Sequence, residues 1–246
     1  MRAAAVPAAR VAARSFAVPR LYAIADLDVL GERALPGAVA AMADAGVRWI
    51  QLRAKSASGA MALSLAEACC RAVEESGATL WIDDRVDVAA LLPVGGVHLG
   101  QADLPPGAAR SLLSTSILIG ASTHDEAQTA AAAADEAVDV VAIGPVFPTT
   151  GKRAPDPAVG LEGVRAARHL TDKPLIAIGG IDETNLGAVL AAGADAVAVL
   201  SAVCRGDVAA LVSPLSRGDI AALVSPVSRG DIAARCRTLL AAVAAA

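Results

Sequence analysis

Aromatic residues, basic clusters and long apolar runs are all scarce in this chain. Only 2% of its 246 residues are aromatic, and 21 lysines and arginines are outnumbered by 25 acidic residues. A nucleic-acid surface needs basic patches with aromatic side chains among them, so that class is excluded. No apolar run reaches the roughly 18 residues of a membrane span. The chain is nevertheless 55% apolar, enough for one large core or two small domains.

Cysteines are few and show no metal-ligand spacing. The four are Cys69, Cys70, Cys204 and Cys236, and the first two are adjacent. This pattern is typical of small core residues in a reduced protein, so we expect a cytoplasmic location. The first 20 residues carry four arginines and no acidic residue. Because arginines interrupt any secretory apolar segment there, we expect a flexible tail over 1–19.

One unit recurs from residue 21 onward: a short apolar run, a polar turn and an Ala-rich helical pattern. Strands alternating with helices predict a parallel sheet with right-handed crossovers. Eight such units over 20–246 predict a single (β/α)8 TIM barrel. A doubly wound open sheet is the alternative, but no GxGxxG follows the first run. The eight expected strands are 21–25, 49–53, 79–83, 96–100, 117–122, 140–144, 174–179 and 196–201. The clearest expected helices are 60–75, 126–136 and 184–192.

Cationic side chains end the second strand. Because strand side chains alternate, Gln51, Arg53 and Lys55 share one face. Active sites of such barrels lie at the carboxyl ends of the strands. The bland alternative is a solvated strand end whose long side chains reach outward.

Carboxylates end the next two strands. Asp83 and Asp84 end the third, while Gln101 and Asp103 follow the fourth. Neighbouring strands lie about 4.8 Å apart, so Asp84 and Asp103 can face one ion. Mg²⁺ in proteins uses one or two carboxylates, waters and substrate phosphates, and cations beside it suit a diphosphate. The alternative is that Asp83 and Asp84 cap the next helix and Asp103 starts a turn.

Polar residues also follow strands five and six. Ser122 and His124 are expected at the mouth, while Thr123 and Glu126 are predicted to form a capping box. A long Pro- and Gly-rich loop after strand six carries the hydroxyls and the cation of Thr149, Thr150 and Lys152. Loops this long in a compact domain are usually functional or disordered.

Small residues follow the last two strands. Gly179 and Gly180 come after the seventh, and VLSA, residues 199–202, ends the eighth. Barrels often bind a phosphate here through backbone N–H groups. A tight glycine turn is the alternative. The sequence therefore predicts a metal-assisted cationic site on strands 2, 3, 4 and 6 and a backbone phosphate site on strands 7 and 8.

Seven ordered motifs resemble those of the thiamine phosphate synthase family. The matching segments are QLRAK, DDRVD, HLGQADL, GASTH, GPVFPTTGK, AIGGI and the LSA segment. The resemblance spans roughly 21–203, and seven motifs in order are far more specific than any one. It implies transfer of 4-amino-2-methyl-5-pyrimidinylmethyl from its diphosphate to 4-methyl-5-(2-phosphoethyl)thiazole, which gives thiamine phosphate and pyrophosphate.

The resemblance also implies roles for particular residues. Asp84 and Asp103 would hold Mg²⁺ as the cofactor. The pyrimidine diphosphate would be bound by residues on strands 2, 3, 5 and 6, namely Gln51, Arg53, Lys55, Asp83, Ser122 and Lys152. The thiazole phosphate would be bound by Thr149, Thr150, Gly151, Gly180, Leu200 and Ser201. The implied catalytic residues are Arg53, Lys55, Ser122 and Lys152, and the partners are small molecules. Ala-rich helices on the barrel exterior fit a monomer or a homo-oligomer.

Two departures from the family pattern leave alternatives open. The usual Asn near the pyrimidine is Asp83 here, and the usual second Thr of the T-x-T-K motif is Gly151. The alternatives are a thiazole tautomerase of the same fold, which would use a histidine where His124 stands, and a non-catalytic phosphate-binding paralogue.

A tandem duplication precedes the end of the chain. Arg205, Arg217 and Arg229 recur every 12 residues (217 − 205 = 229 − 217 = 12). Because solenoid units span about 20 residues or more, such short near-identical units indicate a recent duplication. We interpret 205–228 as an insertion before a last helix over 231–243.

We expect deletion of 205–228 to leave kcat within a few-fold and the melting temperature unchanged or raised. The reason is that the deletion joins the eighth strand by a short loop to one amphipathic helix. Enzyme kinetics and thermal unfolding of the shortened chain check this. Unfolding or loss of activity would place the repeats within the barrel itself.

Overall fold

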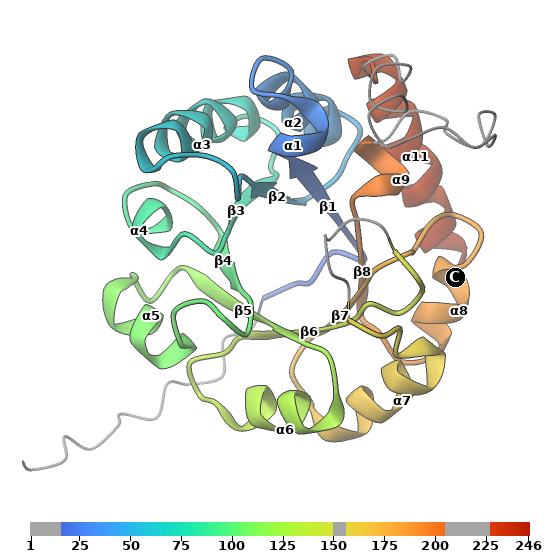
Figure 1. Cartoon of the computed structure of the whole chain (residues 1–246). Helices are drawn as coiled ribbons and strands as arrows, with labels where there is room; N and C mark the ends of the chain where they lie inside the picture. The colour runs from blue at the N-terminus through green and yellow to red at the C-terminus, as the bar shows by residue number, and fades with distance from the viewer. Residues whose placement is uncertain (1–15, 150–155, 205–226) are drawn as a thin grey trace, which may run out of the picture.

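Eight parallel strands close into a barrel in the computed structural model, which describes residues 16–149, 156–204 and 227–246. Each strand pairs with its neighbours in sequence, and β1 pairs with β8 (Figure 1). The strands are β1 Leu21–Asp26, β2 Trp49–Arg53, β3 Thr79–Asp83, β4 Gly96–Leu99, β5 Leu118–Thr123, β6 Val140–Ile143, β7 Leu175–Ile178 and β8 Ala196–Val199. The predicted (β/α)8 barrel is confirmed, and each expected strand lies within two residues of an observed one.

Helices surround the barrel and bury one face against it (Figure 1). They are α1 Leu27–Leu30, α2 Leu35–Asp44, α3 Gly59–Val73, α4 Val86–Ala89, α5 Pro106–Leu112, α6 Glu126–Ala134, α7 Gly160–Leu170, α8 Leu186–Ala191, α9 Ser201–Cys204 and α11 Arg229–Ala245. The side chain of Ser58 caps α3 by accepting from the Met61 N–H at 3.3 Å. Within the described residues, no helix is long and apolar enough to cross a membrane.

The predicted capping box at α6 is wrong. Asp125 is the N-cap, and its Oδ1 accepts from the Gln128 N–H at 2.8 Å. Thr123 is buried at the end of β5, where its hydroxyl donates to the Ala142 carbonyl at 2.9 Å. The hydroxyl thus bonds β5 to β6 and is not available to cap the helix.

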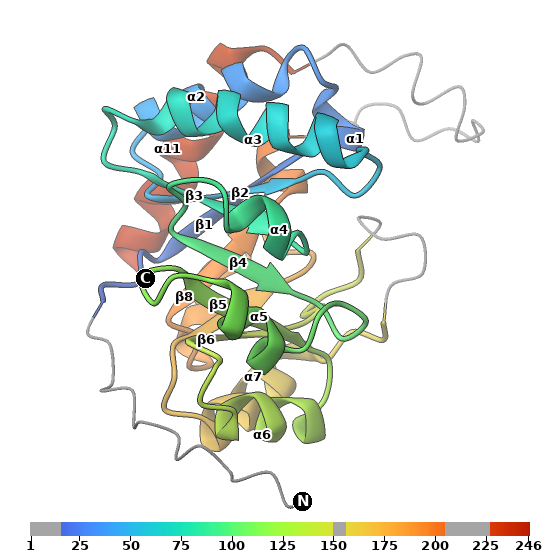
Figure 2. The ribbon, with the colours of Figure 1, turned by 90° about the vertical axis from the view of Figure 1, so that its left-hand side faces the viewer.

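Four aromatic side chains fill the amino-terminal half of the barrel interior. Trp49 and Trp81 have ring centroids 4.6 Å apart, and Tyr22 lies 5.8 Å and 5.6 Å from them. Phe16 stacks on Trp49 at 6.1 Å. Phe16 belongs to the segment predicted as a flexible tail, most of which lies outside the described residues. Figure 2 shows this part of the chain entering from the end opposite to the one at which β4 points.

Two glycines make room for large interior side chains. Gly96 pairs with Trp81, and a Cβ on Gly96 would lie 2.5 Å from the indole ring. Gly120 pairs with His98, and its Cβ would lie 2.6 Å from the imidazole Nδ1. Large side chains on one strand therefore interdigitate with bare backbone on the next, as close-packed interiors require.

The last helix lies against α2, α8 and α9. It begins with a capping box: the Ser228 hydroxyl accepts from the Asp231 N–H, and the Asp231 carboxylate accepts from the Ser228 N–H. The helix observed at Arg229–Ala245 contains the predicted 231–243. The repeats at 205–226 lie outside the described residues.

We predict that Gly96→Ala destabilises the barrel by about 1–3 kcal/mol, because an inserted methyl group clashes with a buried indole. Urea unfolding checks this, with Gly107→Ala as the matched control. A Cβ on Gly107, in α5, meets nothing within 4 Å, so this variant should be neutral or stabilising. Equal stabilities of wild type and Gly96→Ala would contradict the packing described above.

Candidate active site at the mouth of the barrel

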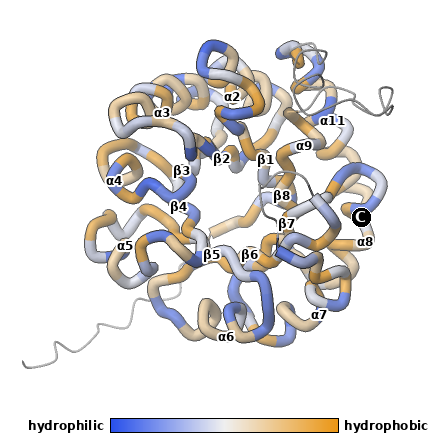
Figure 3. The backbone as a smooth tube through the Cα atoms, viewed as in Figure 1, coloured by the Kyte–Doolittle hydropathy of each residue, from blue (hydrophilic) through white to orange (hydrophobic). Residues whose placement is uncertain are grey.

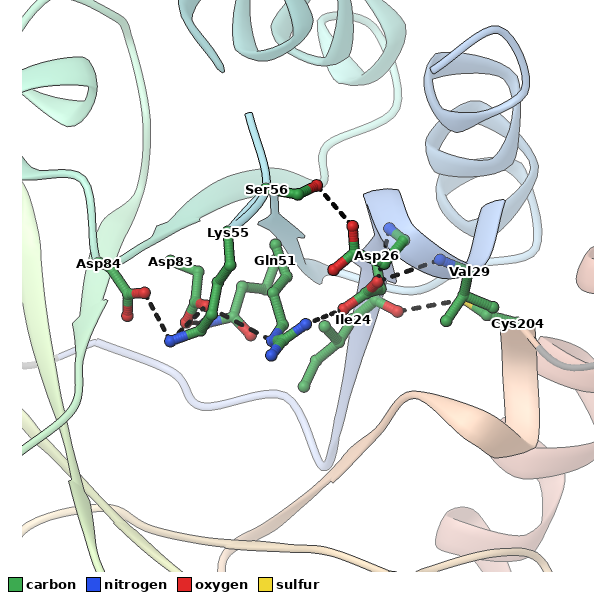
Figure 4. A network of polar contacts seen from close by, with 11 residues as sticks. Ile24, Asp26, Val29, Gln51, Lys55, Ser56, Asp83, Asp84 and Cys204 are labelled. Carbon is green, nitrogen blue, oxygen red and sulfur yellow. Dashed lines mark hydrogen bonds and ion pairs between the residues drawn. The ribbon is translucent and has the colours of Figure 1, made fainter. Parts of the chain in front are cut away.

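Hydrophilic segments meet where β2 and β3 end, while the strands themselves are mostly hydrophobic (Figure 3). The side chains of Gln51, Arg53 and Asp83 come from these two strands, and Lys55 follows β2. Figure 4 shows Gln51, Lys55, Asp83 and Asp84 pointing toward one another. The predicted shared face of Gln51, Arg53 and Lys55 is consistent with their common contacts to Asp83.

Asp83 lies at the centre of this group. Its Oδ1 accepts from the Gln51 amide at 3.1 Å. Its Oδ2 lies 3.7 Å from both Arg53 Nε and Lys55 Nζ, beyond direct hydrogen-bond distance. Burial raises the pKa of Asp83 to about 7, and the negative charge of Asp84 acts in the same direction. The positive charges of Lys55 and Arg53 oppose this shift but do not cancel it.

Lys55 bridges the two adjacent carboxylates. Its Nζ lies 2.6 Å from Asp84 Oδ2, and its side chain is 45% exposed. Partial burial lowers the pKa of Lys55, but the hydrogen bond to Asp84 and the charges of Asp83 and Asp84 outweigh it and leave the pKa raised. The ammonium is therefore charged and accessible from the mouth.

Asp84 and Asp103 form the carboxylate pair predicted to hold a metal ion. Burial raises the pKa of Asp84, and a hydrogen bond with Asp103 raises it further, while Lys55 lowers it. Asp84 has a φ of 61°, and its N–H donates to the His98 carbonyl at 2.9 Å. Asp103 Oδ2 accepts from the Gly100 N–H at 2.7 Å. The left-handed backbone conformation of Asp84 and the turn that contains Asp103 set the directions of these two side chains.

Helix capping does not explain the carboxylates. The N-cap of α4 is Arg85, which makes no side-chain capping bond. Asp103 does take part in the expected turn, through its N–H to the Gly100 carbonyl at 3.2 Å. The turn accounts for one oxygen of Asp103, which accepts from the Gly100 N–H.

The donor set fits Mg²⁺. Two facing carboxylates with mutually unfavourable charge are stabilised by a divalent cation, and Mg²⁺ takes its other ligands from water and phosphate. In the part of the chain that the structure describes, no group of three or more His, Cys, Asp or Glu could hold a metal.

Ser122 lies beside His98 on the neighbouring strand. The serine hydroxyl is 2.9 Å from His98 Nε2. The Gln101 amide donates to the Ser122 carbonyl at 2.6 Å. His98 therefore orients the hydroxyl of a predicted site residue. The alternation of side chains along GVHLG could have predicted this contact, because it places His98 on the interior face of β4, where its side chain is buried.

Asp26 was missed because the predicted first strand stopped one residue short. It is the last residue of β1, is 2% exposed and forms an ion pair with Arg53. A carboxylate directly after an apolar strand was the signal that could have revealed it.

His124 does not belong to the same cluster. Its Nδ1 lies 2.5 Å from the Gly144 carbonyl and its Nε2 lies 3.5 Å from Asp156 Oδ2. It lines a pocket of about 240 Å³ together with residues of α6 and α7. The His124 imidazole therefore points toward the segment after β6 and toward α6 and α7.

Two glycines allow the loops after β6 and β7 to approach closely. Gly179 and Gly180 have φ of 100° and 67°. A Cβ on Gly179 would lie 2.6 Å from Pro145, and one on Gly180 would lie 2.7 Å from Phe147. The N–H of Phe147 donates to the Gly179 carbonyl at 3.0 Å, which ties the two loops together.

The second predicted anion site borders these loops. Thr149 follows the tied segment, and Thr150, Gly151 and Lys152 lie outside the described residues. Leu200 follows β8, and Ser201 begins α9, so its N–H belongs to a first helical turn. The structure thus places Gly180, Leu200 and Ser201 at the ends of adjacent strands.

The fold and the mouth together define a TIM-barrel protein with cations and carboxylates gathered at the carboxyl ends of its strands. The family model of thiamine monophosphate synthase matches residues 21–203. The chain belongs to this family.

Thiamine-phosphate synthases from other organisms are similar to this chain over most of their lengths. The chain is 43% identical over 189 residues to the thiamine-phosphate synthase of Koribacter versatilis, covering 75% of this chain and 88% of the relative. It is 42% identical over 185 residues to that of Albidiferax ferrireducens, covering 75% and 84%. The solved thiamine phosphate pyrophosphorylase of Pyrococcus furiosus superposes with a TM-score of 0.72 and 29% identity, covering 92% of this chain and 96% of that one.

Proposed function

We propose that this chain is a thiamine-phosphate synthase, a transferase that joins the aminopyrimidine diphosphate to the thiazole phosphate and releases pyrophosphate. The family membership and the similar relatives support the activity. The observation at the site that carries it is the placement of Lys55 against Asp84, with Arg53 beside the adjacent Asp83. Cations next to a metal-binding carboxylate pair are what a departing diphosphate requires.

Bond cleavage in this reaction needs charge stabilisation more than proton transfer. The carbon–oxygen bond of the pyrimidine diphosphate breaks, and its electron pair leaves with the diphosphate. Arg53, Lys55 and Lys152 bind the oxygens on which this charge accumulates. Asp84 and Asp103 would hold Mg²⁺, which would supply further positive charge to stabilise the leaving diphosphate.

The pyrimidine is held on the other side of the breaking bond. Asp83 and Gln51, which contact one another at 3.1 Å, bind its polar edge in this proposal. A carboxylate at Asp83 also lies near the positive charge that develops on the pyrimidinylmethyl carbon. Ser122, oriented by His98 at 2.9 Å, contacts the substrate near the breaking bond.

The thiazole completes the reaction from strands 6 to 8. Its ring nitrogen donates a lone pair to the pyrimidinylmethyl carbon, forming the new carbon–nitrogen bond. Its phosphate is bound by Thr149, Thr150, Gly151, Gly180, Leu200 and Ser201. Backbone N–H groups in glycine turns and at helix starts suit a phosphate, and they place the nucleophile close to the carbon.

Product formation with and without Mg²⁺ tests the proposal. We expect the purified chain to form thiamine phosphate and pyrophosphate in equal amounts, and only when Mg²⁺ is present. Isomerisation of a thiazole carboxylate phosphate without Mg²⁺ would instead identify a tautomerase. Binding of substrates without either reaction would identify the non-catalytic paralogue.

We predict that Asp84→Asn and Asp103→Asn each lower kcat/KM by at least about 100-fold, because each removes charge from a ligand set that stabilises the leaving group. Asparagine suits both positions, since it tolerates a positive φ at 84 and can still accept the Gly100 N–H at 103. Initial rates across a Mg²⁺ titration check this. Glu162→Gln, which removes an exposed ion pair on α7, is the control. Wild-type Mg²⁺ dependence in either variant would remove these residues from the metal site.

We predict that Asp83→Asn lowers the KM for the pyrimidine diphosphate. The carboxylate competes with the diphosphate for Arg53 and Lys55, both 3.7 Å away. The amide can still accept from Gln51, so the substitution removes charge while keeping shape. Steady-state kinetics at saturating thiazole phosphate measure the effect. An unchanged or raised KM would contradict this competition and would show that substrate binding depends on the negative charge of Asp83.

A further inference from the structure

The end of β1 contacts one cation of the candidate site, Arg53, and the first turn of α1 contacts Ser56, the residue after the other cation, Lys55. We propose that Asp26 is a positioning residue that orients Arg53 for the diphosphate, and that Asp28 holds the segment carrying Lys55. This inference rests on the proposed function. It concerns side chains that do not themselves contact a substrate.

Both oxygens of Asp26 are engaged. Oδ1 accepts from the N–H groups of Asp28 at 2.8 Å and Val29 at 3.2 Å, which caps α1. Oδ2 accepts from Arg53 Nη1. With a residue exposure of 2%, this carboxylate cannot reach a ligand in the mouth. Its action on a substrate has to pass through Arg53.

Arg53 is held from both sides. β2 lies between β1 and β3, and Asp26 is directly opposite Arg53 in the strand register. The Asp26 carboxylate accepts from Arg53 Nη1, while Asp83 Oδ2 lies 3.7 Å from Arg53 Nε on the other side. An arginine side chain has several rotatable bonds, and a contact at one edge of its planar guanidinium sets the direction of the whole fork. The Asp26 contact is the closer of the two, so it sets that direction.

Capping alone does not explain a carboxylate at this position. A helix N-cap needs a single oxygen acceptor, which serine, threonine or asparagine supplies equally well. The second oxygen of Asp26 and its charge are used only by Arg53 among the contacts described above. A buried carboxylate beside a guanidinium makes a strong, directional contact. Its placement points to orientation of the cation.

The same helical turn holds the segment after β2. The Ser56 hydroxyl donates to Asp28 Oδ1 at 2.5 Å, and Ser56 follows Lys55 directly (Figure 4). Lys55 Nζ then reaches Asp84 at 2.6 Å. Asp26 therefore connects this short helix to Arg53 directly, and Asp28 connects it to the segment that carries Lys55. Misplacement of such groups by a small distance is enough to slow a reaction substantially.

Asp26→Asn separates capping from orientation. The amide oxygen can keep the helix cap, whereas the amide nitrogen cannot accept from Arg53. We expect a retained fold with a lowered melting temperature, because a buried ion pair is lost. We also expect a fall of about 10-fold or more in kcat/KM for the pyrimidine diphosphate, the size of effect that supporting contacts produce. The KM for the thiazole phosphate should stay unchanged, because that site lies on strands 6 to 8. Glu162→Gln is the control for loss of an ion pair.

Binding of inorganic pyrophosphate with Mg²⁺, measured by calorimetry, tests the inference without turnover. We expect Asp26→Asn to weaken this binding about 10-fold and to have no added effect in an Arg53→Ala background, as coupled residues behave. Ser56→Ala, an exposed change that keeps the fold, should weaken it to a smaller extent. Wild-type affinity in both Asp26→Asn and Ser56→Ala overturns the inference, as does an undiminished effect of Asp26→Asn without Arg53. A wild type that binds pyrophosphate but forms no thiamine phosphate would contradict the proposed function alone.

Discussion

Hydrogen bonds between β1 and β8 close the sheet, and every contact at the mouth depends on that closure. The register pairs Leu21 with Val197 and Ala23 with Val199, which brings the last strand beside the first. Parallel strands in a closed sheet deliver all their carboxyl ends to one rim. Asp26 and Ser201 are far apart in sequence, yet closure brings them to the same rim. Without the β1–β8 pairing, residues at the end of β1 and residues after β8 would no longer lie at one rim.

Charge balance is the second constraint on the site. A carboxylate removed from water destabilises a fold unless cations or hydrogen bonds accompany it. Here Arg53 lies between Asp26 and Asp83, while Lys55 lies between Asp83 and Asp84. The raised pKa of Asp83 shows that this compensation is incomplete without further positive charge. In the proposed function, a divalent cation held by Asp84 and Asp103 would supply that charge.

The sequence predicted the barrel and most of the rim because both follow from local periodicity. Strand ends are visible where an apolar run meets a charge, which is how Gln51, Arg53, Asp83 and Asp84 were found. Partner choice is not local. Thr123 is predicted to cap a helix, but its hydroxyl donates to a carbonyl of β6. The partner of Asp26, Arg53, lies a full βα unit away. The direction of His124 depends on Gly144 and Asp156, which no spacing rule brings together.

The interior aromatic cluster has a consequence for observing this protein. Both tryptophans of the chain lie inside the barrel, with ring centroids 4.6 Å apart and planes inclined at 44°. Indoles at this separation couple their excited states, so the pair is a built-in optical reporter. Trp81 precedes Asp83 by two residues on the same face of β3. Light absorbed and emitted by this pair therefore reports on the layer that supports the site, without any label being introduced.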